Sequence, residues 1–369
     1  MIKRMIFHAP YALPALAKSG SRVRPKKMRE AFRNLGYEVF DLTGTVSERR
    51  KKKRHLRQLI RSGVHFDFLY YENSTQPNLF AGRSLKDGIA PFLDHRIHRM
   101  CIANDIPVGI FYRDVYWKFR KEMDGPTSFL NRVAEIFQRV DWLIYRRNRV
   151  SLFLPSLPMG NYLNLSGFNA VHPLPPGAEV VETPVVSECN LFYVGGIGSH
   201  YRFEKLWKAV ANTQAKMRVC VPKEAWETSK REYVPENQKN IEVVHGSGQE
   251  ITQHWNWAGL GVLALEPQEY RSFAAPIKLF DYLGHGKPVL VSAGTYAAEF
   301  ISETQAGWVI PYDASAMRDF LNYLARNPTE ISEKAAFARR VAQNNTWQSR
   351  AETVVSELIG NSQGEQKRH

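Results

Sequence analysis

One segment, residues 271–291 with the sequence RSFAAPIKLFDYLGHGKPVLV, constrains the fold of this chain more than any other. Pro276 suits the first turn of a helix, the apolar residues after it recur at helical spacing, and Gly284 and Gly286 suit the helix end. Val289-Leu290-Val291 then forms a short apolar run of the kind found in strands that are buried on both faces. The segment therefore predicts a helix that leads directly into a parallel strand.

The same helix carries two charged side chains close to its N-terminal end. Lys278 and Asp281 are three residues apart and so share one helical face. The free backbone amides and the dipole of a helix N-terminus attract phosphate groups, and a lysine there adds a full positive charge. This end of the helix is therefore a candidate phosphate-binding site.

Strand and helix patterns alternate along the rest of the chain, which predicts an α/β fold. Besides 289–291, strands are expected at 5–8, 35–40, 66–71, 106–112, 142–145, 190–194, 217–221, 241–246 and 260–265. Helices are expected at 24–34, 92–103, 129–140, 202–213 and 347–358, with a disordered tail after them.

Length and a proline-rich stretch divide the chain into domains. At 369 residues the chain exceeds the size at which a single hydrophobic core usually stops growing. Residues 173–184 are rich in proline, as is typical of a connection between domains, and they indicate a boundary near residue 185. We expect domains at 1–185 and 186–345, followed by a final helix and tail at 346–369.

Composition narrows the class of protein and its compartment. Hydrophobic residues make up 44% of the chain and charged residues 23%, which is typical of a soluble globular protein. No run of about 20 apolar residues is present to span a bilayer, and the opening residues lack the apolar core of a signal peptide. Cys101, Cys189 and Cys220 lie far apart, which disfavours a disulfide framework or a zinc site. We expect a cytoplasmic protein with reduced cysteines.

The formal net charge of +14 predicts an anionic partner, and the basic segment RRKKKRHLRQLIR at 49–61 concentrates that charge. Leu56, Leu59 and Ile60 give the segment an apolar edge at helical spacing. Two interpretations stay open: a helix that lies on the anionic inner face of the cell membrane, and a solvated basic face or loop. A nucleic-acid partner is disfavoured, because the chain has no zinc-finger spacing, RNP-like run or interleaved aromatic and basic residues.

Polar residues follow the strand expected at 106–112. Ligands of open parallel sheets bind at the carboxyl ends of the strands, so polar side chains at that edge are functional candidates. Asp114 is the first candidate for a catalytic role and Arg113 the second. The alternative is a surface turn that a local salt bridge stabilises.

A glycine-rich turn, residues 195–198, follows the strand expected at 190–194. A dinucleotide-binding fingerprint would need a third glycine in the pattern GxGxxG, but Tyr201 occupies that position and the dehydrogenase interpretation fails. Exposed amides at Gly196, with Arg202 and Lys205 behind them, would suit a diphosphate. The alternative interpretation is that Arg202 is a solvated residue in the first turn of the following helix and binds no ligand.

The stretch PIKLFDYLGHGKPVLVS at 276–292 resembles the P-x-K-[LF]-x-E-[YA]-[LM]-A-x-G-[KV]-P-V-[VI] signature of retaining, GT-B-fold glycosyltransferases of the family 4 type. Gly294, Glu299 and residues 306–309 also resemble the pattern that follows this signature. The resemblance covers 192–311 by sequence and the N-terminal half by architecture only. It implies two Rossmann-like domains facing across a cleft, the first for the acceptor and the second for a nucleotide sugar, with the final helix crossing back to the first.

The resemblance also implies roles for individual residues. The residues it assigns to donor binding are Gly196, Arg202, Lys205, Lys278, Leu279 and Asp281. It places Ser19, Gly20 and Ser21 in a loop that faces the donor phosphates and the acceptor, and it puts Asp114 and Arg113 close to the reacting sugar.

One position departs from the family pattern. The family has a pair of carboxylates spaced E-x7-E, and Asp281 fills the second position, but Phe273 occupies the first. This departure leaves open which carboxylate, if any, meets the sugar.

The expected activity is that of a hexosyltransferase-type glycosyltransferase, which moves a sugar from a UDP-sugar or GDP-sugar to a glycan or lipid-linked acceptor. The resemblance further implies retention and a place in surface polysaccharide or glycoconjugate biosynthesis. No Asp-x-Asp triplet occurs in the chain, so we expect fixed cations, with no essential metal and no cofactor, to neutralise the diphosphate. Two alternatives stay open: a GT-B-fold sugar-nucleotide 2-epimerase and a catalytically silent partner subunit.

Overall fold

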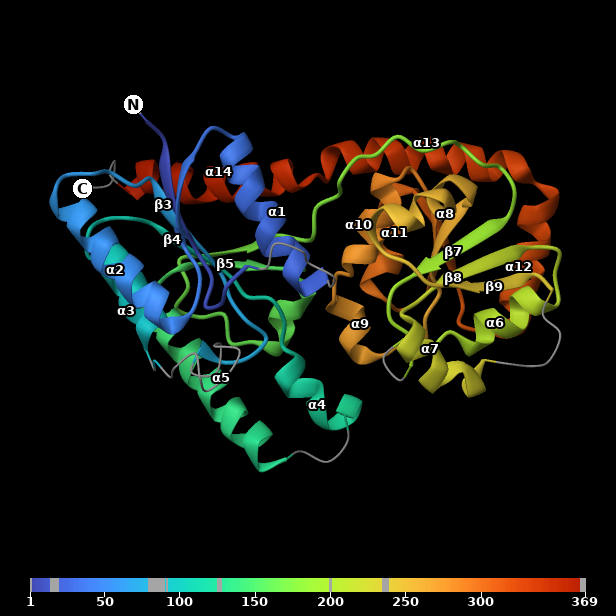
Figure 1. Ribbon diagram of the computed structural model, residues 1–369, viewed down its shortest axis with the longest axis horizontal. Helices are drawn as coiled ribbons and strands as arrows, with labels where there is room; N and C mark the ends of the chain where they lie inside the picture. Colours follow the sequence, from blue (N-terminus) through green and yellow to red (C-terminus); the bar gives the residue numbers. More distant parts are fainter. Residues whose placement is uncertain are drawn as a thin grey trace. The chain divides into compact units, whose positions relative to one another are not determined.

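The computed structural model describes residues 2–13, 20–78, 90, 92–124, 128–198, 201–233 and 239–365. The chain forms two compact units, of which unit 1 comprises Met1–Pro175 and Trp347–His369 and unit 2 comprises Pro176–Thr346. Each unit contains one six-stranded parallel sheet among the described residues (Figure 1). The expected α/β architecture is therefore confirmed.

The sheet of unit 1 has the strand order β2-β1-β3-β4-β5-β6. Its strands are β1 (Arg4–His8), β2 (Glu38–Leu42), β3 (Phe68–Glu72), β4 (Val108–Phe111), β5 (Ser151–Leu154) and β6 (Ala170–Pro173). From β1 the chain passes to β2 on one side, and β3 to β6 then follow one another on the other side of β1. The strand order therefore reverses between β1 and β3. In open α/β sheets, ligands bind at the carboxyl ends of the strands beside such a reversal.

Helices cover both faces of the unit 1 sheet. They are α1 (Gly20–Asn34), α2 (Val46–Arg61), α3 (Leu93–Ile102), α4 (Tyr116–Asp124), α5 (Phe129–Arg147) and α14 (Trp347–Glu365). Figure 1 shows α1 and α14 on one face and α2, α3 and α5 on the other. Gly109 in β4 allows α14 to pack closely against the sheet, because a Cβ at this position would lie only 2.9 Å from Cδ1 of Leu358.

The sheet of unit 2 has the strand order β12-β11-β10-β7-β8-β9. Its strands are β7 (Asn190–Val194), β8 (Lys216–Cys220), β9 (Ile241–Val244), β10 (Leu260–Leu263), β11 (Val289–Ser292) and β12 (Gly307–Ile310). The order reverses between β7 and β10, so the carboxyl ends of these two strands mark the expected ligand edge of this unit.

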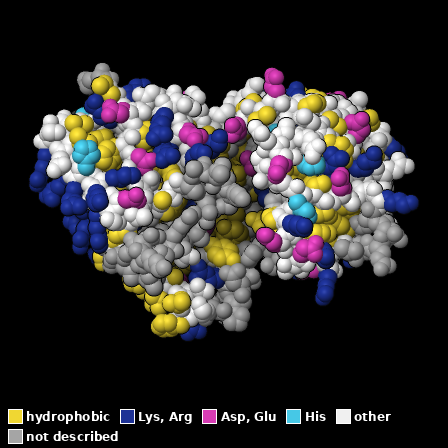
Figure 2. All heavy atoms as spheres, viewed as in Figure 1, with side chains coloured by type: hydrophobic (Ala, Val, Ile, Leu, Met, Phe, Trp, Pro, Cys, Tyr) yellow, Lys and Arg dark blue, Asp and Glu magenta, His cyan; other side chains and the backbone are white. Residues whose placement is uncertain are grey.

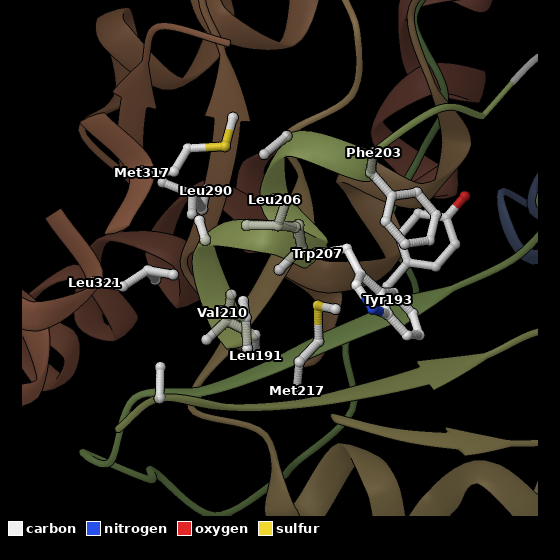
Figure 3. Packing of buried hydrophobic residues seen from close by; sticks show 14 of the residues in the cluster. Leu191, Tyr193, Phe203, Leu206, Trp207, Val210, Met217, Leu290, Met317 and Leu321 are labelled. Carbon is white, nitrogen blue, oxygen red and sulfur yellow. The ribbon is translucent and has the colours of Figure 1, made fainter. Parts of the chain in front are cut away.

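Two apolar clusters fill the faces of the unit 2 sheet. Its helices are α6 (Glu204–Ala211), α7 (Lys223–Ser229), α8 (Thr252–Trp257), α9 (Glu269–Phe273), α10 (Ile277–Gly284), α11 (Tyr296–Thr304), α12 (Ala314–Arg326) and α13 (Pro328–Asn344). On one face, α6 and α12 insert Leu206, Val210, Met317 and Leu321 against the strands (Figure 3). On the other face, α8, α10, α11 and α13 form the second cluster around Phe280. Burial of this apolar surface is the main stabilising contribution in both layers.

Two expectations about the ends of helices were wrong. The strand expected at 142–145 is the last part of α5, because Gln138, Trp142 and Tyr145 are buried at helical spacing along one side of that helix. The strand of this region is β5, which follows the helix. The final helix continues from Trp347 to Glu365, well beyond Leu358, where a disordered tail was expected.

The division between the units lies at Pro175, earlier than the boundary expected near residue 185. The proline-rich segment after Pro175 is hydrogen-bonded along unit 2. Val181 N–H donates to the carbonyl of Gly284 at 2.9 Å, and the Lys287 ammonium donates to the carbonyl of Pro184 at 2.8 Å. These contacts attach the segment to the second sheet, so it belongs to unit 2.

The basic segment at 49–61 belongs to the helix α2, so it is not a loop, and its first arginine is not on the surface. Arg49 is 1% exposed and its guanidinium pairs with Asp94 of α3, which is also 1% exposed. The same carboxylate contacts His8 Nε2 at 2.8 Å. Burial alone would raise the pKa of Asp94, but Arg49 and the His8 hydrogen bond more than offset it and lower the pKa to about 2. This buried group joins α2, α3 and β1.

None of the helices among the described residues combines the length and apolar character that a bilayer crossing requires.

Candidate functional site

The helix predicted from the signature segment is α10, and it begins at the carboxyl edge of the unit 2 sheet. Pro276 precedes it and Ile277 is its first residue, so Lys278 lies in the first turn as predicted. Leu279 is fully buried and packs in the core, which anchors the helix. Lys278 and Asp281 are both half-buried beside that core.

The Lys278 ammonium lies against the turn that follows β7. It donates a hydrogen bond to the hydroxyl of Tyr193 at 3.0 Å, and it lies 4.1 Å from the ring centre of Tyr201. A Cβ on Gly195, whose φ is +139°, would be 2.2 Å from the Lys278 ammonium. A glycine is therefore required at residue 195 both for its backbone angle and for the space that the lysine occupies.

Burial shifts the titration of both charged residues of α10. It lowers the pKa of Lys278 to about 7, Arg271 lowers it further, and Asp281 offsets only part of this effect. Burial likewise raises the pKa of Asp281 to about 7, and Lys278 opposes that shift. Near neutral pH this pair can therefore take up or release a proton when an anion binds, which is a property of many functional sites.

Residue 273, where the family pattern has its first carboxylate, is buried in the core and not open to a ligand. Phe273, at the end of α9, is fully buried and so contributes packing. Glu269 begins the same helix and is exposed, while Glu266 follows β10 and its side chain is 38% exposed. The Arg271 guanidinium donates to the backbone carbonyl of Glu266, which fixes the loop between β10 and α9.

Arg202 and Lys205 contact other residues than Lys278 does, so the structure does not group these three predicted cations around one shared contact. Arg202 pairs with Glu204 at 2.9 Å and with Glu266 at 3.6 Å. The Lys205 ammonium donates to the carbonyl of Tyr312 at 3.0 Å. Gly196 lies in the turn itself, where a Cβ would be 2.8 Å from the Tyr201 ring.

Arg113 and Asp114 lie at the carboxyl end of β4 in unit 1, as predicted. Arg113 donates from its guanidinium to the Tyr11 hydroxyl at 2.8 Å, and its backbone N–H donates to Asn73 Oδ1 at 2.9 Å. Asp114 accepts from the hydroxyl of Thr75 at 3.1 Å. Burial raises the pKa of Asp114 above its ordinary value, although its hydrogen bonds oppose the shift.

Sequence reasoning missed a buried carboxylate beside Arg113. Glu72, the last residue of β3, is fully buried; Arg24 Nε lies 3.1 Å from its Oε1, and Arg113 lies 3.8 Å from its Oε2. The Tyr70 hydroxyl also donates to this carboxylate at 2.7 Å. A charged residue directly after an apolar strand is the signal that could have identified Glu72, since it ends β3 at the reversal of strand order.

The loop predicted at Ser19, Gly20 and Ser21 is only partly within the described residues. Ser19 lies outside them. Gly20 and Ser21 are the first residues of the helix α1, so the expectation of a loop at these two positions was wrong.

No family model matches the sequence, and no curated protein matches it by sequence. Solved structures do match its fold. Sucrose-phosphate synthase from Thermosynechococcus elongatus has a TM-score of 0.64 and 11% identity, with 96% of this chain and 97% of that chain covered. HepE from Anabaena, in complex with UDP and glucose, has a TM-score of 0.61 and 12% identity over 97% of this chain and 100% of that chain.

WaaG, a glycosyltransferase involved in lipopolysaccharide biosynthesis, has a TM-score of 0.57 and 14% identity over 97% of this chain and 100% of that chain. At such identities these likenesses concern the fold alone. Nearly whole-chain coverage, together with two parallel six-stranded sheets, shows that this chain has the two-domain GT-B fold.

Proposed function

We propose that the protein is a glycosyltransferase that takes a sugar from a nucleotide sugar. The observation that carries this proposal is the placement of Lys278 at the start of α10, against the glycine turn that ends β7. This is the edge where a parallel sheet of this order binds ligands. The fold likeness to HepE, which was solved with UDP and with UDP-glucose, supports a nucleoside diphosphate there.

Transfer from such a donor leaves a nucleoside diphosphate, whose growing negative charge has to be neutralised. Lys278, when protonated, would supply a positive charge, and the amides of the turn would supply further hydrogen-bond donors. We assign to Asp281 the acceptance of a hydrogen bond from a donor hydroxyl. We therefore propose transfer without an essential metal or cofactor, by the retaining, family 4 type of enzyme, from a UDP-sugar or GDP-sugar.

We assign the acceptor to unit 1 and the donor to unit 2. The support in unit 1 is the cluster at the carboxyl ends of its strands, where Arg113, Asp114 and Glu72 lie beside the reversal of strand order. The acceptor would be a glycan or lipid-linked glycan of a surface polysaccharide or glycoconjugate pathway. WaaG, whose fold is similar, is described as acting in lipopolysaccharide biosynthesis.

Thermal unfolding in the presence of UDP, GDP, ADP or CMP, each with and without EDTA, tests the proposal. We expect one nucleoside diphosphate to stabilise the protein by about 2.7 kcal/mol when its concentration is about 100 times its dissociation constant. EDTA should leave that shift unchanged. Stabilisation by none of the nucleotides would contradict the donor site, and stabilisation abolished by EDTA would contradict the metal-free mechanism.

One observation favours a second candidate, a catalytically silent partner subunit. Phe273 is fully buried where the family has a carboxylate, so no side chain at that position reaches a ligand. A silent subunit would bind a nucleotide without hydrolysing or transferring its sugar. Release of nucleoside diphosphate from the stabilising nucleotide sugar therefore distinguishes the two candidates.

We further propose that the enzyme works in the cytoplasm, as a peripheral protein on the anionic inner face of the cell membrane. Arg50, Lys51 and Arg54 of α2 are exposed on the helix layer that faces away from α1 and α14. On α5 in the same layer, Phe129 is 79% exposed, Ile136 60% and Leu143 52%, and these residues recur every seven positions. Apolar side chains along one line of a helix, in the same layer as basic residues, suit a bilayer interface.

Sedimentation with phosphatidylcholine vesicles containing phosphatidylglycerol tests the membrane assignment. Changing Phe129, Ile136 and Leu143 to Gln should reduce the bound fraction severalfold, because their apolar surface would no longer enter the interface. The control changes the exposed Val180, Val181 and Val185 of unit 2 to Gln and should bind as the wild type does. Equal binding by all three proteins would contradict this use of α5.

A further inference from the structure

A cavity of about 570 Å³ lies between α2 and α3, outside the site described above. Its lining residues are Lys53, Arg57, Ile60, Arg61, Arg96, Arg99, Met100, Ala103 and Asn104. Five of these nine residues are basic and none is acidic. Figure 2 shows Lys and Arg gathered at the edge of the molecule where Figure 1 places α2. We call this cavity the α2–α3 groove.

Helical spacing aligns the cations of the α2–α3 groove. Lys53, Arg57 and Arg61 follow one another every four residues and so form a single row on α2. Arg96 and Arg99 are three residues apart on α3 and supply the opposite wall. The buried pair of Arg49 and Asp94 joins the two helices, so the walls are held in place by the core of unit 1.

The positive charges in the groove lack acidic partners within the part of the chain that the structure describes. Among the described residues, no ion pair with a carboxylate is found for any of the five cations. Like charges four residues apart destabilise a helix, so this arrangement acts against the stability of α2. Burial lowers the pKa of Lys53, and the positive charges of Arg96 and Arg57 lower it further. A bound anion would relieve this repulsion.

We propose that the α2–α3 groove is a binding site for a group that carries two or more phosphate charges. Guanidinium groups bind phosphate through paired hydrogen bonds, and four of the five cations are arginines. Five positive charges in one cavity exceed what a single phosphodiester would neutralise. The methylene and apolar surface of Ile60 and Met100 suits a carbon-containing portion attached to the phosphates.

This proposal does not depend on the donor site, because the groove lies wholly within unit 1 and shares no residue with Lys278 and its neighbours. The ligand could come from two sources with the same chemistry, a soluble polyphosphate compound or the head group of a phosphomonoester lipid. An extended nucleic acid fits less well, since the cations surround a cavity and include no aromatic side chain for a base to stack on.

The groove variant changes Lys53, Arg57 and Arg96 to Gln. Its matched control changes Lys208, Lys216 and Lys223 to Gln, which removes the same number of charges from exposed positions of unit 2. Thermal unfolding checks that both variants fold. A third protein, Lys278→Ala, reports any binding of the probe at the donor site.

In the first arm, tripolyphosphate is titrated into each protein by calorimetry. We expect the groove variant to bind at least tenfold more weakly than the wild type, and the control to bind within about twofold of the wild type. Lys278→Ala should lose only binding at the donor site, so the binding event that depends on the groove should remain in this variant. Equal weakening in the groove variant and its control would show an effect of net charge only and would overturn the proposal. Weakening in Lys278→Ala alone would assign the probe to the donor site and also overturn it.

In the second arm, binding is compared on phosphatidylcholine vesicles that contain either phosphatidic acid or phosphatidylglycerol at equal surface charge. If a lipid head group is the source, the wild type and the control should prefer phosphatidic acid, and the groove variant should lose that preference. If the source is soluble, tripolyphosphate binding should depend on the groove while no protein shows a lipid preference. Groove-dependent binding of a single-stranded RNA 20-mer without tripolyphosphate binding would overturn the proposal in favour of nucleic acid.

Discussion

A Lys278→Ala variant should bind the stabilising nucleoside diphosphate about 10- to 100-fold more weakly than the wild type. Lys278 is the cation that the structure places at the start of α10, beside the glycine turn of unit 2. A hydrogen bond to a charged group contributes about 1.5–3 kcal/mol, and each 1.4 kcal/mol corresponds to a factor of ten in the dissociation constant. Isothermal titration calorimetry at about pH 6.5, below the pKa of Lys278, measures the difference.

A Lys334→Ala variant provides the control for this experiment. Lys334 is on α13 of the same unit, where its ammonium donates to the side chain of Gln305 at 3.1 Å. Its removal lowers the net charge equally and should leave the affinity unchanged. If both variants bind as the wild type does, or weaken binding to the same degree, Lys278 is not part of the donor site.

The pH dependence of the same affinity gives a second readout. Because the pKa of Lys278 is about 7, the ammonium loses its proton above neutral pH and must regain it when the diphosphate binds. Affinity should therefore fall above pH 7, by at most about tenfold per pH unit for one coupled proton. Asp281 ionises over the same range and acts in the same direction, so the dependence should disappear only when Lys278→Ala is combined with Asp281→Asn.

An Arg49→Leu variant should lose about 3–5 kcal/mol of unfolding free energy, because it leaves the buried Asp94 carboxylate without its cation. Arg49 and Asp94 are each 1% exposed, so water cannot replace the lost partner. Urea denaturation at neutral pH, with circular dichroism as the readout, measures the loss. The exposed neighbour Arg50→Leu should change the free energy by no more than about 0.5 kcal/mol.

Two further measurements separate loss of the ion pair from loss of packing. The double variant Arg49→Leu with Asp94→Leu should be more stable than Arg49→Leu alone, since neither buried charge is then unpaired. In the wild type the pKa of Asp94 is lowered from 3.8 to about 2, so its contribution is present above pH 4 and is lost as the pH falls toward 2. A double variant no more stable than the single one would mean that packing, and not charge, explains the loss.

Most of the fold could be predicted from the sequence because buried parallel strands are short apolar runs between helices. The runs before Arg113 and before Gly195 could be recognised in this way. The same pattern gave the wrong prediction of a strand at 142–145, because an apolar stretch of four residues does not distinguish a strand from the buried side of a helix. Its inclusion in α5 depends on contacts with the sheet, which are not visible in local sequence.

The donor side of the candidate site could be predicted better than the acceptor side. Lys278 and Asp281 belong to one helix, so their spacing alone places them together. The cluster of Arg24, Glu72 and Arg113 unites residues from three separate elements, which only the packed sheet brings together. The burial of Arg49 was likewise invisible, because its neighbours in the sequence are exposed cations.

The C-terminal helix has a consequence for the order in which the chain acquires its structure during synthesis. Trp347, Ala351, Val354 and Leu358 of α14 belong to the same apolar cluster as Phe7 and Phe32 near the beginning of the chain. During translation, the N-terminal sheet therefore lacks part of its apolar core until α14 has been synthesised. Residues 176–346, in contrast, form a continuous unit that can fold before translation ends. Nascent chains stalled before residue 347 should thus expose the N-terminal sheet to chaperones and proteases even when unit 2 has already folded.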